Sequence, residues 1–251
     1  MKRKSRYIFS LSFFVLGLVL SLSFFCVFKS LSKTKSVNSQ FENIVPSFSI
    51  YFLSVNSCVS ENEAHLLAED LFAEDFAGFV WQNNDKFEII VSAYKNENDA
   101  TLVKNKLKSE GFNVEIFVDS FPEFNITSTY SDSEQKILLE ALTSFSQTFD
   151  NLYDISISLV NNLINEISAK LELNRAITNF NKTKSDFDTV FFQNDDFLNT
   201  ISSHLFQCQQ TLNNLTNDER LSSKQTFSSL IKYKYTDILS INKNLLNELK
   251  T

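Results

Sequence analysis

Glycine and proline are scarce in this sequence. Its 251 residues include 3 Gly and 2 Pro. Glycine supplies the positive φ angles that tight hairpin turns require, and both residues dominate turns generally. An all-β domain built from many short hairpins is therefore disfavoured, and helices joined by longer loops are favoured. Hydrophobic residues make up 43% and charged residues 21% of the chain, so it can still bury a core.

Groups of residues that carry chemistry are also lacking. The sequence has 2 His and 3 Cys, none of them at the spacing of a metal site, and it has no G-x-S-x-G, phosphate-loop or H-E-x-x-H motif. Its paired carboxylates are expected on solvated helix faces rather than in the desolvated cleft that a glycosidase needs. These pairs are Glu69 with Asp70, Glu74 with Asp75, and Asp195 with Asp196. We predict a protein that is not an enzyme, with no catalytic residues, no metal and no cofactor.

One long hydrophobic run lies near the N-terminus. Residues 7–28 contain no charged side chain and follow the basic stretch MKRKSR. As a helix this run would be roughly 33 Å long, enough to cross a bilayer core. A cleaved signal peptide is the less favoured alternative, because no A-x-A-like site follows. The excess of basic residues before the run predicts a single-pass type II membrane protein, with its C-terminal body outside the cytoplasm.

The charge distribution bears on the class of partner. Residues 1–35 hold seven of the 23 basic side chains and no acidic one, which leaves 16 basic against 30 acidic side chains in the rest. An acidic body without a basic patch argues against nucleic acid as a partner. Cys58 and Cys208 would be able to pair if the body is exported, but two unpaired thiols are the simpler expectation.

Residues 48–120 repeat one unit twice. At an offset of 36 residues, YFLSVNSCVSENEAHLLAEDL aligns with FEIIVSAYKNENDATLVKNKL, so that Val55 meets Val91, Glu61 meets Glu97 and Ala64 meets Ala100. Each copy reads as a strand, a capped helix and a second strand. Neither copy can bury an apolar face alone. Side by side, the two β-α-β units predict an α+β domain: a four-stranded sheet with both helices on one face and the other face open.

This pattern resembles the SPOR (sporulation-related repeat) domain of bacterial envelope proteins. The resemblance lies in the two strand-helix segments quoted above and in their position after an N-terminal hydrophobic run. It implies a βαββαβ fold of the ferredoxin or RNP kind and a peptidoglycan-binding role in cell division or sporulation. The implied ligand is the glycan strand, especially where stem peptides have been removed.

The residues that the resemblance places on the open sheet face form the candidate peptidoglycan-binding site. They are Phe52, Ser54, Asn56, Trp81, Glu88, Ile90 and Ser92. Where the family tends to carry Gln, Gly and Arg, this chain has Ser54, Asn56 and Ile90. Glu88 would repel the carboxylate of a muramic acid by about 1 kcal/mol in a high dielectric. The competing interpretation is that this face packs on the C-terminal helices or on a protein partner.

The remainder of the chain is expected to be helical. Capping boxes are predicted at Ser60 with Glu63, Ser131 with Glu134, and Thr216 with Glu219. The SPOR-like domain lies between linkers at 36–47 and 121–130. Residues 131–249 are predicted to form a three-helix bundle. The first helix of this bundle is expected to extend to about Phe180 and to end at NKTKSD. A dimeric coiled coil is the alternative.

Two functions follow from these features. The first is a membrane-anchored, non-catalytic peptidoglycan-binding protein of bacterial cell division or sporulation, with the helical domain contacting other proteins of that process. The alternative is an envelope scaffold that binds only protein partners through its helical domain and sheet face.

Overall fold

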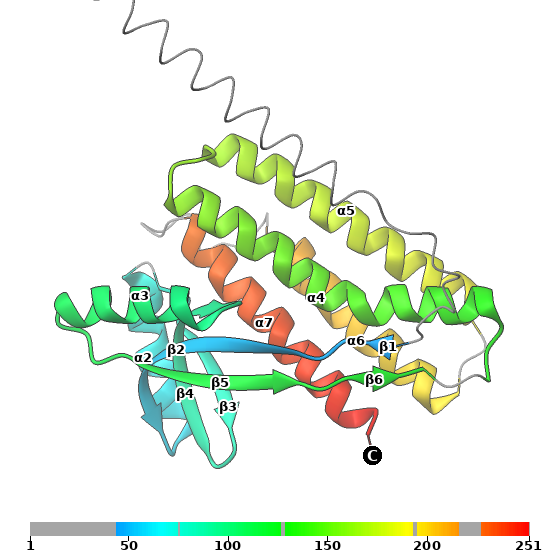
Figure 1. Cartoon of the computed structure of the whole chain (residues 1–251), viewed down its shortest axis with the longest axis horizontal. Coiled ribbons are helices and arrows are strands. Elements are labelled where there is room, and N and C mark those ends of the chain that lie inside the picture. The colour runs from blue at the N-terminus through cyan, green and yellow to red at the C-terminus, as the bar shows by residue number, and fades with distance from the viewer. Residues whose placement is uncertain (1–43, 75, 127–128, 193–194, 216–226, 251) are drawn as a thin grey trace, which may run out of the picture. The chain divides into compact units, whose positions relative to one another are not determined.

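The computed structural model describes residues 44–250 except 75, 127–128, 193–194 and 216–226 (Figure 1). Its strands are β1 (Ile44–Val45), β2 (Phe48–Cys58), β3 (Phe79–Asn83), β4 (Lys86–Tyr94), β5 (Glu115–Phe121) and β6 (Phe124–Asn125). Its helices are α2 (Glu61–Ala73), α3 (Glu97–Ser109), α4 (Asp132–Val160), α5 (Glu166–Val190), α6 (Asp196–Asn213) and α7 (Phe227–Glu248). The chain is therefore α+β, and residues from Asn43 onward form one compact unit.

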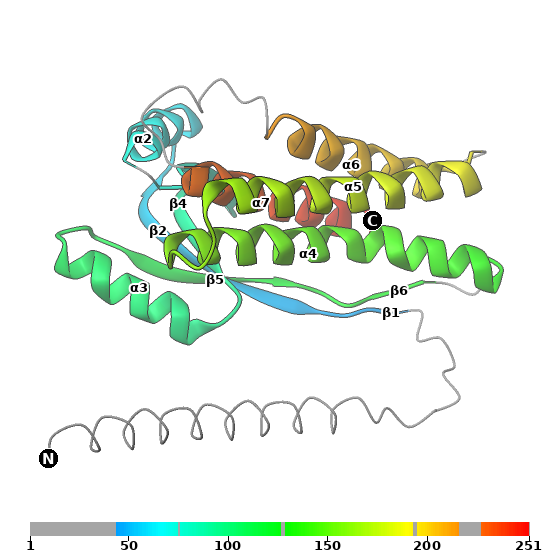
Figure 2. The same ribbon diagram turned by 90° about the horizontal axis from the view of Figure 1, so that it is seen from above.

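The repeated region forms a four-stranded antiparallel sheet with the order β3-β4-β2-β5. This order is that of a β-α-β-β-α-β unit. The first strands of its two halves, β2 and β4, lie in the middle of the sheet, and the second strands, β3 and β5, lie at its edges. Helix α2 packs against β3 and β4, and helix α3 packs against β2, β4 and β5 (Figure 2). Strands β3 and β4 are joined by a two-residue turn whose first residue, Asn84, has a φ of 53°.

Small residues let α2 approach the sheet closely. Ala64 and Ala68 are buried and pack in one cluster with Ile89 of β4. Just before β3, Gly78 has a φ of 57°, and a Cβ atom there would lie 2.3 Å from the carbonyl oxygen of Ala68. Because only glycine combines that angle with that contact, Gly78 fixes how the chain passes from α2 into the sheet.

A second, two-stranded sheet lies in the segments that were predicted to be linkers. Strand β1 pairs antiparallel with β6, with Ile44 opposite Asn125 and Val45 opposite Phe124. This pairing ties the beginning of the described chain to the segment that leads into α4. The extended chain thus continues beyond both ends of the predicted domain at 48–120.

The described residues of the C-terminal half form four helices, where three helices were predicted. The helix expected to reach about Phe180 ends at Val160 instead, because Asn162 takes a left-handed φ of 55°. Asn165 then caps α5 by accepting from the Ser168 amide, and α5 runs through the NKTKSD segment that was expected to break it. Asparagine tolerates both roles, so an Asn-rich turn reverses the chain without glycine or proline.

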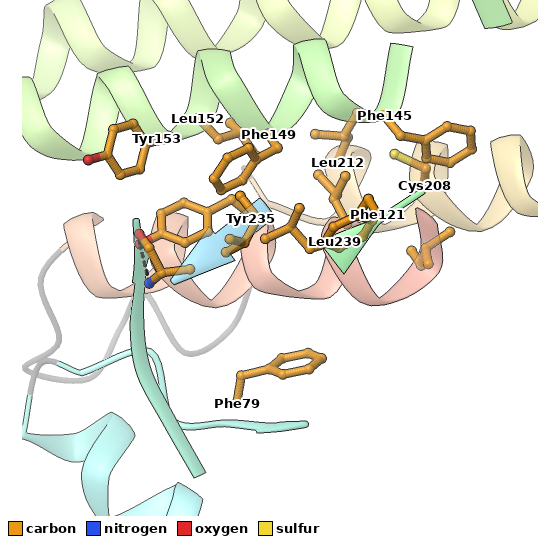
Figure 3. Close-up of a cluster of buried hydrophobic side chains, with 14 of the residues drawn as sticks. Phe79, Phe121, Phe145, Phe149, Leu152, Tyr153, Cys208, Leu212, Tyr235 and Leu239 are labelled. Carbon is orange, nitrogen blue, oxygen red and sulfur yellow. Dashed lines mark hydrogen bonds between the residues drawn. The ribbon is translucent and has the colours of Figure 1, made fainter. Parts of the chain in front are cut away.

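Helix α7 lies between the sheet and the other C-terminal helices. Residues around most of its circumference are buried, including Leu230, Tyr235, Ile238 and Leu245. A helix that is buried on all sides occupies the centre of a fold rather than its surface. Figure 3 shows Tyr235 and Leu239 of α7 beside Phe149 and Leu152 of α4, with β-strands on the opposite side of α7. The sheet face that was expected to be open is therefore covered.

The predicted membrane architecture is corrected by the described helices. None of the helices within the described ranges has the length and apolar character needed to cross a bilayer. Polar residues interrupt them, as in α5, where Lys182 and Asp186 form an exposed ion pair. The expected transmembrane fold and the type II membrane localisation are thus wrong for this part of the chain. The hydrophobic run 7–28 that prompted them lies outside the described residues.

Candidate functional site

Most of the residues predicted to bind glycan are inaccessible. Of the seven, only Asn56 is exposed and Glu88 is half-buried, whereas the other five retain 6% or less of their surface. Those five are Phe52, Ser54, Trp81, Ile90 and Ser92. The pairing of β2 with β4 changes register on both sides of Ser54, between Leu53 and Ser54 and between Ser54 and Asn56. The structure therefore gathers these side chains within the molecule rather than on a free surface.

Several of these residues do contact one another. The rings of Phe52 and Trp81 lie 4.5 Å apart, and Ser54 donates a hydrogen bond of 2.8 Å to the Glu88 carboxylate. Ile90 is fully buried, so the position where the family tends to carry arginine belongs to the core. A charged side chain at that position would lose its hydration on burial, which explains why an apolar residue stands there.

Tyr235 of α7 joins the bundle to the centre of the sheet. Its hydroxyl oxygen lies 3.1 Å from Ser92 Oγ and 3.4 Å from the backbone nitrogen of Ala93, which donates to it (Figure 3). Its ring packs edge-on against Phe149 of α4, with a centroid separation of 5.5 Å. One side chain therefore satisfies buried polar groups of β4 and fills the core of the bundle.

Two further residues of α7 hold the edges of the same face. The ring of Tyr233 lies 5.2 Å from that of Phe79 on β3. The Lys243 ammonium pairs with the Asp119 carboxylate of β5 and lies 5.2 Å from the centre of the Trp81 ring. With Tyr235, these contacts reach strands β3, β4 and β5, so α7 is attached across the width of the sheet.

Three tyrosines at this junction are held in their neutral form. Burial raises the pKa of Tyr235 and of Tyr94, and it raises the pKa of Tyr153 to about 12. The Tyr153 ring lies 6.3 Å from Tyr94 and 6.2 Å from Tyr235, so the three rings form one cluster. Ionising any of them would place a charge in an apolar environment.

A polar cavity of about 460 Å³ lies at the outer edge of the sheet, beside β3. Glu61 and His65 of α2 form one wall, and Ser240, Lys243, Asn244 and Asn247 of α7 form the other. Val80, Trp81, Gln82, Asn84 and Phe87 line it from the β3-β4 hairpin. The indole nitrogen of Trp81 is buried and has no hydrogen-bond acceptor among the described residues.

A second cavity, of about 390 Å³ and mostly apolar, lies between α3 and α4. Leu102 and Val103 of α3 face Tyr153, Ile157 and Val160 of α4 across it. Among the described residues that line this cavity, no side-chain nitrogen or oxygen atom is both buried and without a hydrogen-bond partner.

Metal and thiol chemistry find no support in the described part of the chain. No group of three or more His, Cys, Asp or Glu residues there is arranged to hold a metal ion. Cys58 and Cys208 are both free and buried, and desolvation raises the pKa of the Cys208 thiol far above its usual range. Of the paired carboxylates, Asp195 has a structural role, because it caps α6 by accepting from the Leu198 amide.

Sequence reasoning missed the residues of α7 that determine the state of the sheet face. Tyr233 and Lys243 lie on other sides of the helix than the apolar stripe that includes Ile231 and Ile238, and Tyr235 lies at the edge of that stripe. The available signal was the excess of large side chains in IKYKYTDIL, which gives the helix more than one packing face.

Comparisons of this chain with protein-family models, with curated proteins and with solved structures found no match.

Proposed function

We propose that this protein is a non-catalytic scaffold that binds a protein partner, with its sheet face permanently covered by its own helix α7. The observation that carries this proposal is the burial of Phe52, Trp81 and Ile90 beneath α7. A surface that is already packed against the chain's own helix is not available to a ligand. The surfaces left for recognition are the outer faces of the helices and the edge of the sheet.

An energetic comparison supports a covered face over a glycan-binding one. Exposing a large apolar side chain costs about 1.5–3 kcal/mol, so uncovering Phe52, Trp81 and Ile90 would cost roughly 5–9 kcal/mol before α7 itself is counted. A ligand bound with micromolar affinity contributes about 8 kcal/mol. Glycan binding at this face would therefore be largely cancelled by the loss of the α7 contacts.

The exposed apolar side chains agree with protein as the class of partner. Four of them cluster around the turn between α4 and α5: Val160, Leu163, Ile167 and Leu171, with Ile167 81% exposed. Ile167 and Leu171 are four residues apart in α5 and so share one side of that helix, and Leu163 lies in the turn that precedes it. Groups of exposed apolar residues are typical of protein contacts, whereas sugar sites rely on polar groups and aromatic ring faces.

Peptidoglycan binding in bacterial cell division or sporulation is the second candidate function. It is favoured by the β-α-β-β-α-β order, which agrees with the resemblance to the SPOR domain. It requires α7 to leave the sheet, so that Phe52 and Trp81 become accessible for stacking on sugar rings. In that case α7 would act as an inhibitor of glycan binding.

Sedimentation with isolated peptidoglycan sacculi distinguishes the two functions. We expect the full chain to stay in the supernatant, both with untreated sacculi and with sacculi whose stem peptides were removed by an amidase. Sedimentation that increases after amidase treatment would contradict the proposal and support glycan binding. A Tyr235→Ala variant that sediments when the wild type does not would assign the inhibitory role to α7, with Tyr130→Ala as the control outside the junction.

A further inference from the structure

We propose that the free edge of strand β3 binds an extended, basic segment of a partner protein, which adds to the sheet as a fifth strand. This inference rests on the proposed protein-binding function and specifies its site. Addition of a strand to a sheet edge is a common mode of peptide recognition, in which backbone hydrogen bonds supply affinity and side-chain pockets supply specificity.

The backbone of β3 has groups available for such pairing. Strand β3 lies at the end of the order β3-β4-β2-β5, so within the described sheet only β4 pairs with it. Asn83 and Lys86 flank the two-residue turn and form a hydrogen-bonded pair, and the pattern alternates along the hairpin. Val80 and Gln82 therefore direct their N–H and C=O groups away from β4, toward the open edge.

The surroundings of this edge suit a single extended chain. The polar cavity of about 460 Å³ has α2 residues on one side and α7 residues on the other, with the edge of β3 between them. Side chains of an added strand would point alternately to the two walls. Those pointing to α7 would meet the Ser240 hydroxyl and the Asn244 and Asn247 amides, and those pointing to α2 would meet Glu61 and His65.

The indole N–H of Trp81 is an independent sign of a missing partner. This nitrogen is buried, belongs to a side chain that retains 2% of its surface, and has no acceptor among the described residues. A buried donor without an acceptor costs about 1–3 kcal/mol, so such groups are rare unless a ligand or water satisfies them. Trp81 lines the same cavity, which allows a carbonyl or side-chain oxygen of the added segment to accept this hydrogen bond.

Charge indicates which segment is favoured. Glu61 on the α2 wall keeps 64% of its side chain exposed and has only His65, at 3.7 Å, beside its carboxylate among the ion-pair partners described, whereas Lys243 on the α7 wall is paired with Asp119. The whole chain has a formal net charge of −7, so a second copy would be repelled at this edge. A segment with lysine or arginine on the side facing α2 complements both the wall and the overall charge.

The chain has a single tryptophan, so its indole N–H gives one identifiable signal in an NMR spectrum of the ¹⁵N-labelled full chain. We would titrate three probes: an octapeptide of alternating lysine and threonine, its glutamate-threonine counterpart, and a chito-oligosaccharide. We expect the basic peptide to shift the indole signal and the Val80 and Gln82 amide signals, with an affinity about tenfold higher than that of the acidic peptide.

Two variants of Gln82 test the backbone contact directly. Gln82→Pro removes an outward N–H at a sheet edge, a position where proline is tolerated, and Gln82→Ala keeps that N–H. We expect proline to weaken binding of the basic peptide about tenfold, which corresponds to about 1.4 kcal/mol, and alanine to leave it within about twofold. Circular dichroism spectra of both variants verify that they fold.

Each other outcome has a defined meaning. Equal binding to both Gln82 variants, peptide shifts confined to residues outside β3, or no shift with either peptide would overturn the strand-addition inference while leaving protein binding elsewhere in place. A shift of the indole signal by the chito-oligosaccharide, without a response to peptide, would overturn both this inference and the proposed function.

Discussion

The hydroxyl oxygen of Tyr235 lies 3.1 Å from Ser92 Oγ, and these two residues are 143 positions apart in the sequence. Tyr235 belongs to the last helix and Ser92 to the third strand of the repeated unit. Their contact joins two parts of the chain that sequence patterns describe as separate domains. The sheet face that such a domain would use for binding thereby becomes an internal interface.

Removing the Tyr235 hydroxyl group should weaken this interface without creating a cavity. We expect Tyr235→Phe to lower the free energy of unfolding by about 1–2 kcal/mol, because buried polar groups of β4 lose a hydrogen-bond partner. Urea denaturation of the full chain measures the change. Tyr130→Phe is the matched control, since Tyr130 is only half-buried, and we expect it to stay within about 0.5 kcal/mol of the wild type. Equal losses would contradict a special role for Tyr235.

The free energy of unfolding should fall at alkaline pH because of the buried cluster of Tyr94, Tyr153 and Tyr235. Burial raises the folded-state pKa of Tyr235 and Tyr94, and that of Tyr153 to about 12, above the unfolded value of about 10. Between these values the unfolded chain has released protons that the folded chain still holds, so unfolding becomes more favourable as pH rises. Tyr235 alone should contribute about 1.4 kcal/mol per pH unit from about pH 10 upward. Urea denaturation at pH 9 and 11 tests this, with a smaller decrease expected for Tyr235→Phe.

Gly78 and Gly111, the two glycines among the described residues, both have positive φ and should respond differently to alanine. At Gly78 the added Cβ would meet the Ala68 carbonyl oxygen at 2.3 Å, whereas at Gly111 no atom lies within 4 Å. We expect Gly111→Ala to cost about 1 kcal/mol from backbone strain alone, and Gly78→Ala to cost about 2–4 kcal/mol because a steric clash is added. Thermal and urea denaturation measure both variants. A similar cost at the two sites would show that α2 can move away from β3.

Helix caps that look alike in the sequence should contribute unequally. Ser131 and Glu134 form a complete capping box at the start of α4, whereas the Ser60 side chain makes no capping hydrogen bond at the start of α2. Ser131→Ala should therefore lower the free energy of unfolding by about 1 kcal/mol, whereas Ser60→Ala should lower it by only a few tenths of that amount. Comparing the free energies of unfolding of the two variants checks this difference.

Features specified by local residues were predictable from the sequence. The strand-helix-strand units with their N-cap at Asn96 and the turn at Asn84 and Asp85 depend on residues a few positions apart. The end of α4 was missed because Asn161 and Asn162 carry no glycine or proline signal. The third predicted capping box, at Thr216 and Glu219, lies outside the described residues.

The candidate site was not predictable in the same way. The alternation of β4 marks Ile90 and Ser92 as one face, but it cannot tell whether solvent, a ligand or another helix lies against that face. That outcome depends on Tyr233, Tyr235 and Lys243, which lie more than 130 residues further along the chain. Long-range packing thus determines that this face is buried, and the polar cavity beside β3 is lined by residues of both α2 and α7.

Fluorescence of Trp81 tests most directly whether α7 covers the sheet. Because Trp81 is the only tryptophan and retains 2% of its surface, its emission reports on this face alone. With α7 in place, the full chain should emit at short wavelength, and acrylamide should quench it severalfold less than it quenches the chain unfolded in concentrated urea. Long-wavelength emission, with quenching of the folded chain close to that of the unfolded chain, would show that the sheet face is open and contradict the covered interface.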